Sequence, residues 1–326
     1  MSVIVTGGSG AVGYHLLSSL TRNKGKLISF SRSASRKGLH LDHVHYEYGD
    51  ILDYASVSKI IQHYQPKEIY HLATQANVGV SHKKPYATLE TNILGTQNLL
   101  EAVRRFQPEC KVLLLSSSDI YGRGKGLLDV MHREEDPYNP MTPFATSKAT
   151  MELLGKQHHQ AWGTHVVIAR PFNFTGPGQA AEFVLPYVAN QLVRIRDFFA
   201  EPVLYTGNLD VSRDFIDIRD LTRALVLLMS QATPGEAYNI CSGKIRTVRE
   251  LVENMIQLAH LDVEIRRDPS RERAFDQPLL MGSPDKLMQQ TGWKPMIDLW
   301  DSLNDLLHHC TYLTHRNLEE DENRLI

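Results

Sequence analysis

The hydrophobic pattern of the chain alternates between short apolar runs and longer segments in which apolar residues recur at helical spacing. The runs SVIVT, KLISF, KEIYHLA, KVLLL and HVVIA are bounded by glycine or polar residues, which is typical of buried parallel strands. Helical spacing is found in residues 11–23, 86–106 and 145–162. Strands that alternate with helices of this length predict right-handed βαβ units. We therefore expect an α/β protein with a doubly wound parallel sheet.

The alternation loosens after residue 172, where a glycine- and proline-rich loop begins. Helical spacing returns in residues 182–196, 219–231, 246–259 and 296–312. We expect a dinucleotide-binding domain over 1–172 with parts of 215–245, and a smaller substrate-binding lobe over 173–214 and 246–312. Residues 313–326 are polar and are predicted to be a frayed end.

The composition excludes several classes of function. The 326 residues include 35 basic and 37 acidic ones, and this balance does not favour nucleic-acid or membrane partners. The cysteines at 110, 241 and 310 form no CxxC pair, and the 15 histidines form no HExxH motif, so no metal site is expected. No signal peptide and no apolar run of spanning length is found, which predicts a cytoplasmic protein.

The segment TGGSGAVG, at residues 6–13, has the pattern of a dinucleotide-binding loop in a Rossmann-type sheet. Gly7 permits a tight turn, Gly10 lets the backbone approach a pyrophosphate, and Gly13 permits close packing of the helix on the sheet. Ala11 and Val12 open the helix, whose N-terminal N–H groups can bind the anion. A glycine loop alone is weak evidence, but its place after a strand and before a helix favours a dinucleotide.

The end of the second strand indicates which dinucleotide is bound. The segment FSRSASRK contains Arg32 and no acidic residue that would hold the ribose 2′-hydroxyl of NAD. An arginine suits the 2′-phosphate of NADP(H), although a solvated basic loop is the alternative. Asp50 and Ile51 follow the third strand, where they are expected to flank the adenine. Leu72 and Ala73 end the fourth strand, at the edge of the sheet where ligands bind.

Together these motifs resemble the extended short-chain dehydrogenase/reductases that act on nucleotide sugars. The resemblance extends over residues 2–312 and includes TGGSGAVG, GDILD, IYHLA, LLLSSSDIYG and ARPFNFTGPGQ. Segments of the substrate lobe, such as GNLDVSRDFIDIRDLTRAL, are most similar to GDP-4-keto-6-deoxy-D-mannose reductases and then to GDP-mannose 4,6-dehydratases. The resemblance implies a homodimer formed through the helices at 89–106 and 144–162, although a core-facing apolar stripe would give the same spacing.

The resemblance also implies roles for individual residues. Ser117 lies where the family hydrogen-bonds the sugar 4-oxygen, and Lys148 lies where it holds the nicotinamide ribose. Residues expected to contact the nucleotide-sugar substrate are Asn173, Val184, Arg213 and Arg273. Asp119 stands where the dehydratases have a glutamate that removes the C5 proton, so dehydration remains open alongside reduction.

Phe144 stands where the family has its catalytic tyrosine, four residues before Lys148 on the same helix face. It keeps the ring and lacks only the hydroxyl that exchanges a proton with the sugar. Three interpretations are open: an introduced Tyr→Phe change, a natural variant that relies on Ser117, Asp119 or water, or a catalytically silent binding protein. The leading hypothesis is NADP-dependent reduction of the 4-keto group of a GDP-linked 6-deoxyhexose. The alternatives are a 4,6-dehydratase and a silent protein that binds NADP and a nucleotide sugar.

Overall fold

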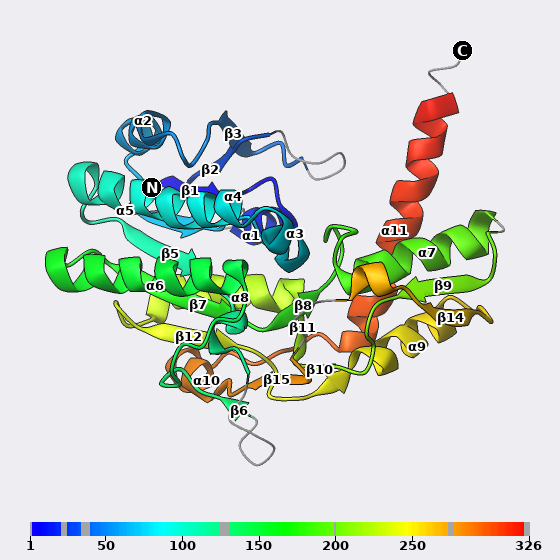
Figure 1. The fold of residues 1–326 in the computed structure, drawn as a ribbon. Coiled ribbons are helices and arrows are strands. Elements are labelled where there is room, and N and C mark those ends of the chain that lie inside the picture. The colour runs from blue at the N-terminus through cyan, green and yellow to red at the C-terminus, as the bar shows by residue number, and fades with distance from the viewer. Residues whose placement is uncertain are drawn as a thin grey trace.

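A computed structural model describes residues 2–20, 25–33, 40–123, 131–198, 200–272 and 277–322. Its largest sheet contains seven strands in the order β12-β7-β5-β4-β1-β2-β3, and every neighbouring pair is parallel (Figure 1). The strands are β1 (Ser2–Thr6), β2 (Lys26–Ser31), β3 (Val44–Tyr48), β4 (Glu68–His71), β5 (Lys111–Leu115), β7 (Val166–Pro171) and β12 (Ala237–Ile240). The predicted doubly wound parallel sheet is confirmed.

Helices cover both faces of this sheet, which explains the continuous apolar runs of its strands. Val3 and Val5 of β1 pack into one core with α1 (Ala11–Leu20) and α8 (Ile218–Gln231), to which α10 (Asp285–Thr291) adds Leu287. Ile4 points to the opposite core, with α2 (Tyr54–Tyr64), α5 (Gly95–Phe106) and α6 (Pro143–Trp162). Alternate residues of one short strand therefore supply both cores.

The helix expected over residues 86–106 is divided into several elements. It consists of α4 (Pro85–Leu89), a π-helical turn η1 (Glu90–Leu94) and α5, and it is preceded by α3 (Val78–Lys83). Lys84, between α3 and α4, has a non-helical backbone with φ −135° and ψ 62°, as expected for the residue before a proline. Such π turns are frequent at functional sites, and Asn92 within η1 contacts the candidate site described below.

The C-terminal half forms a third hydrophobic core, which lies beside the carboxyl edge of the large sheet (Figure 1). The core is formed mainly by α7 (Val184–Phe198), β9 (Val203–Thr206), α9 (Val248–Leu258), β14 (Glu264–Arg267) and α11 (Leu299–Glu322). Shorter elements connect the two halves: β6 (Met131–His132), β8 (Asn173–Thr175), β10 (Ser212–Arg213), β11 (Phe215–Asp217), β13 (Arg246–Thr247), β15 (Leu279–Gly282), and the 3-10 turns η2 (Ser118–Tyr121) and η3 (Pro269–Arg271). Because β6 pairs with β15, the halves are interleaved.

The expectation of a frayed end after residue 312 is wrong for most of that segment, because α11 continues to Glu322 and projects from the body (Figure 1). Contacts with α7 support the helix as far as His315. Arg196 donates to Thr311 Oγ1 at 2.8 Å, and Nε2 of His315 lies 3.0 Å from Oδ2 of Asp197. Among the helices of the described residues, none has the length and apolarity that crossing a bilayer requires.

Candidate active site

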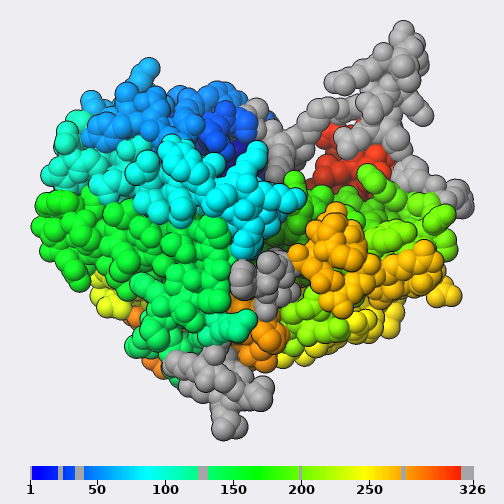
Figure 2. Space-filling view, viewed as in Figure 1, coloured from blue at the N-terminus to red at the C-terminus, as the bar shows by residue number. Residues whose placement is uncertain are grey.

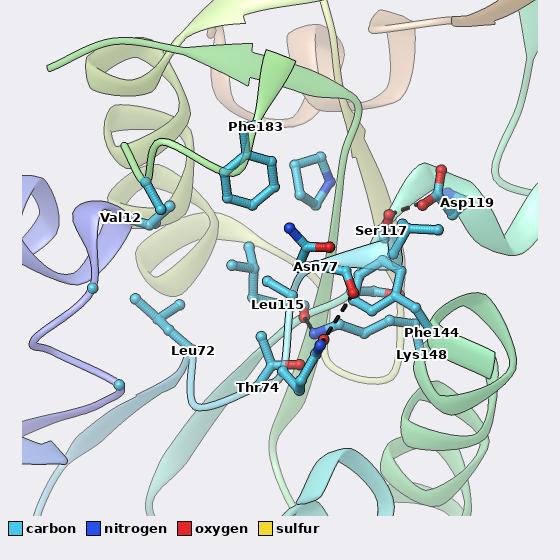
Figure 3. A pocket seen from close by; sticks show the side chains of 18 of the residues that line it. Val12, Leu72, Thr74, Asn77, Leu115, Ser117, Asp119, Phe144, Lys148 and Phe183 are labelled. Carbon is cyan, nitrogen blue, oxygen red and sulfur yellow. Dashed lines mark hydrogen bonds between the residues drawn. The ribbon is translucent and has the colours of Figure 1, made fainter. Parts of the chain in front are cut away.

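A cavity of about 840 Å³ lies at the carboxyl edge of the large sheet and extends from the glycine loop to the C-terminal lobe. Figure 3 shows Val12 and Leu72 on one side of it, Ser117, Asp119, Phe144 and Lys148 on the other, and Phe183 above. The structure brings most of the residues expected from the sequence to this single cavity: Gly7, Gly10, Ala11, Val12, Gly13, Arg32, Ile51, Leu72, Ala73, Ser117, Asp119, Phe144, Lys148, Asn173 and Arg213.

The glycine loop at the first end of the cavity fits a dinucleotide. Gly7 has φ +71°, and a Cβ on it would lie 2.8 Å from the backbone nitrogen of Ala73. A Cβ on Gly13 would lie 2.6 Å from the carbonyl oxygen of Gly7, so the helix could not approach the loop. Since the first N–H groups of α1 have no partner within the helix, they are available to an anion in the cavity. The exposed Arg32 lines the same end.

Three residues expected in the site are not placed in this cavity. Asp50 does not line it, because its carboxylate accepts a hydrogen bond from the Leu52 N–H at 3.0 Å and shapes the turn before α2. Val184 does not line it either; the side chain that does is Phe183, one residue earlier, immediately before α7 begins. Arg273, with Arg36 and Lys37 of the basic loop, lies outside the described residues.

Lys148 lies on α6 and reaches the end of β5. Its Nζ donates to the carbonyl oxygen of Leu115 at 2.6 Å. Only 2% of the side chain surface is exposed, and this burial lowers the pKa of Lys148 to about 7, although Glu152 opposes the shift. The pKa of the Lys148 ammonium group therefore lies near neutral pH.

Phe144 lies one turn before Lys148, with the Nζ atom 5.8 Å from the centre of its ring. Thr142 caps the helix by accepting from the Ala145 N–H at 3.0 Å, which fixes where α6 begins. The ring is 6% exposed and lines the cavity. The Phe144 ring therefore faces the cavity, and this side chain carries no proton to donate.

Neither of the two nearby tyrosines, Tyr121 and Tyr138, places its hydroxyl in the cavity. Tyr121 donates to Oδ1 of Asn239 at 2.7 Å, and Tyr138 donates to Oε2 of Glu152 at 2.9 Å. Burial raises the pKa of both phenols, and neither residue lines the described cavity. Both tyrosines lie close to Phe144 along the chain, but the structure shows their hydroxyls hydrogen-bonded in a neighbouring network.

That network is a buried ion pair behind the site. The guanidinium of Arg170 on β7 donates to both carboxylate oxygens of Glu152 on α6, and neither side chain is exposed to solvent. Arg170 also donates to Tyr121 at 2.8 Å, while Ser116 donates to Glu152. The network joins α6, β5 and β7, and it holds fixed the helix that carries Phe144 and Lys148.

Ser117 and Asp119 form the turn that follows β5. The Ser117 hydroxyl oxygen accepts from the Asp119 N–H at 3.2 Å, so its own proton can be donated elsewhere. Both residues line the cavity, as the sequence predicts. Figure 3 shows them on the same side of the cavity as Phe144.

The sequence reading missed the loop that follows β4, whose residues Thr74, Gln75 and Asn77 line the cavity. Oδ1 of Asn92 accepts from the Gln75 N–H at 2.8 Å, and its Nδ2 donates to Ser147 Oγ at 2.8 Å. The Ser147 hydroxyl in turn donates to the carbonyl oxygen of Phe144 at 2.7 Å. Asn92 therefore fastens this loop to α6. The position of these residues directly after HLA, at the ligand-binding edge, is the signal that could have found them.

The other end of the cavity is polar. Arg213, on β10, is buried and donates to the Ser212 carbonyl oxygen at 2.9 Å. Asn173, Gln179 and Gln277 also line this end. The Arg213 guanidinium and these amides suit a ligand that carries both negative charge and hydroxyl groups.

The family model described as GDP-mannose 4,6 dehydratase matches residues 4–306. The chain belongs to this family. Its members here include a GDP-6-deoxy-D-mannose reductase of Pseudomonas aeruginosa, 38% identical over 242 residues, which cover 74% of this chain and 79% of the relative. A GDP-mannose 4,6-dehydratase of Yersinia enterocolitica is 26% identical, and the match covers 90% of this chain and 89% of the relative.

Solved structures of the family show the same fold. The structure of RMD from Pseudomonas aeruginosa complexed with NADPH has a TM-score of 0.83 and 33% identity, covering 95% of this chain and 99% of that one. A Thermus thermophilus UDP-glucose 4-epimerase in complex with NAD has a TM-score of 0.85 and 27% identity, with the same coverage. The predicted membership of the extended short-chain dehydrogenase/reductase family is confirmed.

Proposed function

We propose that this protein is an NADPH-dependent enzyme that reduces the 4-keto group of a GDP-linked 6-deoxyhexose. The observation that supports it is the single cavity that joins the glycine loop and Arg32 to Ser117 and Lys148, and these to Arg213. A dinucleotide at one end and a nucleotide sugar at the other would place their reacting groups between Ser117 and Lys148. The 38% identity to a GDP-6-deoxy-D-mannose reductase supports the same substrate class.

The residues at the first end support NADP(H) as the cofactor. Gly7, Gly10 and Gly13 leave room for a pyrophosphate at the N-terminus of α1. Arg32 would pair with a 2′-phosphate through charge-assisted hydrogen bonds. When bound, a reduced nicotinamide supplies hydride to a ketone carbon.

The remaining roles belong to the chain's own side chains. Ser117 would donate a hydrogen bond from its hydroxyl to the sugar 4-oxygen and so orient the ketone, without transferring the proton. Lys148, anchored on the Leu115 carbonyl, would hold the nicotinamide ribose. Arg213 and Asn173 would bind the substrate diphosphate and its sugar. Phe144 would pack against these groups without taking part in proton transfer.

Single-turnover nicotinamide absorbance tests this function. The protein is loaded with NADPH and mixed with GDP-4-keto-6-deoxymannose, and Phe144→Tyr is measured beside it. A general acid typically contributes about 10²–10⁴-fold, so Phe144→Tyr is expected to raise the rate by at least a hundredfold unless another group already supplies the proton. If both forms bind the sugar nucleotide but neither oxidises NADPH, reduction is not the function.

Dehydration of GDP-mannose is the second candidate, favoured by the family model and by the position of Asp119 in the cavity. Asp119 would then be the base that removes the C5 proton. A dehydratase returns its hydride within each turnover, so no net NADPH is consumed. Formation of a 4-keto product from GDP-mannose with constant NADPH absorbance would support it over the reductase.

A homodimer through α5 and α6 is also part of the proposal. The two helices contact each other on one face of the molecule (Figure 2), next to α4 and η1. Large apolar side chains are exposed there, among them Tyr86 at 76% and Leu153 at 53%. Exposed large apolar side chains on helices that lie next to each other favour a protein interface. A cytoplasmic location stays a prediction.

A further inference from the structure

The site described above lacks an obvious proton donor for the sugar 4-oxygen, because Phe144 has no hydroxyl and the phenols of Tyr121 and Tyr138 are bonded elsewhere. An ionised carboxylate accepts hydrogen bonds and does not donate them. Reduction of a ketone, however, ends with a proton on oxygen. The proton must come from another group in the cavity or from solvent.

We infer that Lys148 is itself the proton donor in this chain, delivering its proton to the sugar 4-oxygen directly or through one water beside the Phe144 ring. This inference rests on the proposed reductase function and identifies the group that acts as the general acid in that reaction. Hydride addition converts the carbonyl carbon to C–H and breaks the C=O π bond. The oxygen takes one proton from the Lys148 ammonium, which leaves a neutral amine that regains its proton from solvent before the next turnover.

The geometry around Lys148 supports this role. One of its three protons is bonded to the carbonyl oxygen of Leu115 at 2.6 Å, which fixes the ammonium at the end of β5 and leaves two protons for other partners. The side chain lines the cavity, and its Nζ lies 5.8 Å from the centre of the Phe144 ring.

The charged groups around Lys148 permit it to lose a proton. Glu152, on the same helix, favours the ammonium form, but its carboxylate is already paired with Arg170. His71, on the neighbouring strand β4, is neutral, because burial and Lys148 lower its pKa to about 3. Asp119 and Arg213 line the same cavity with opposite charges. Burial dominates this balance and brings the pKa of Lys148 to about 7, close to the value that serves general acid catalysis at neutral pH.

The experiment compares two independent titrations of the unaltered chain. The protonation midpoint of Lys148 is measured by NMR of ¹³C-labelled lysine side chains in the complex with NADPH, and its signal is assigned by its loss in Lys148→Arg or Lys148→Met. The single-turnover rate of NADPH oxidation with the 4-keto sugar nucleotide is measured over the same pH range. The exposed Lys59→Arg is the control, and its rate is expected to match that of the parent.

We expect the rate to be constant below the NMR midpoint and to fall tenfold per pH unit above it, because only the ammonium form can donate. A rate that is independent of pH across that midpoint would overturn the inference. A rate that falls with pH around a different midpoint would also overturn it. If Phe144→Tyr reduces the substrate while the parent does not at any pH, Lys148 is not a donor but the proposed function stands. If neither form reacts, the proposed function and the inference both fail.

Discussion

Two neighbouring buried basic side chains, Lys148 in the cavity and His71 behind it on β4, both have lowered pKa values because of burial. His71 places Nδ1 2.8 Å from Thr6 Oγ1 and Nε2 3.0 Å from Thr96 Oγ1. The two hydroxyls can hydrogen-bond both nitrogens of a neutral imidazole ring, because a hydroxyl can donate or accept a hydrogen bond. His71 thus connects β1, β4 and α5 through hydrogen bonds that do not need a charge.

Burial of His71 predicts a loss of stability in acid. Its pKa is about 3 in the fold and 6.5 without it, so below pH 6.5 only the unfolded chain takes up this proton. Between pH 7 and pH 5 this costs about 2 kcal/mol. Urea unfolding at the two pH values should show a smaller loss in His71→Gln than in the parent. The exposed His43→Gln should behave as the parent does; an equal loss in both variants would contradict the prediction.

Arg32 predicts the choice between dinucleotides. It is the charged residue at the end of β2 that lines the cavity near the glycine loop. Removing a phosphate-binding arginine costs roughly 1.5–3 kcal/mol, so Arg32→Ser should weaken NADPH binding by about tenfold or more and leave NADH binding unchanged. Fluorescence titration with both dinucleotides measures this. Lys59→Ser, which removes one positive charge from α2, is the control. If Arg32→Ser weakens the binding of NADPH and of NADH to a similar extent, Arg32 does not contact a 2′-phosphate.

At the scale of elements, the buried pair Glu152–Arg170 fastens α6 to β7. Removing one partner leaves the other charge buried without compensation, which costs about 3–5 kcal/mol. Glu152→Gln and Arg170→Met should each lower the free energy of unfolding by that amount, measured by denaturant titration. The double variant should lose less than the sum of the two. As a control, Glu264→Gln breaks an exposed ion pair with Arg266 and should change the free energy of unfolding little. If the losses of the two single variants simply add in the double variant, Glu152 and Arg170 do not act as one unit.

Contacts between elements also explain why the expected long helix is divided into α4, η1 and α5. The spacing of apolar residues in 86–106 fits one continuous helix. In the structure, Asn92 bonds to the Gln75 backbone and to Ser147, and the π turn around it puts its amide between the two. The partners lie 17 and 55 residues away along the chain. A contact of this range cannot be read from local periodicity.

At the scale of the whole molecule, the exposed apolar face of α4, α5 and α6 predicts self-association. Leu153→Glu places a charge in the centre of this face, where burial in a partner would be costly. Light scattering coupled to size exclusion should give a dimer for the parent and a monomer for this variant. Met296→Glu, exposed on a different part of the molecule, should remain dimeric. If Leu153→Glu is also dimeric, the interface lies elsewhere.

The sequence by itself determined the sheet, the glycine loop and most of the residues that meet in the cavity, because period and motif are local properties of the chain. The domain boundaries stay a prediction. Only the tertiary structure decided that Phe183 and not Val184 faces the site, that Asp50 shapes a turn, and that α11 continues to Glu322. It also decided which hydroxyls are free beside Phe144, since the partners of Tyr121 and Tyr138 come from distant strands and helices. Burial, which sets the pKa of Lys148, likewise exists only once β5 and α6 are packed together.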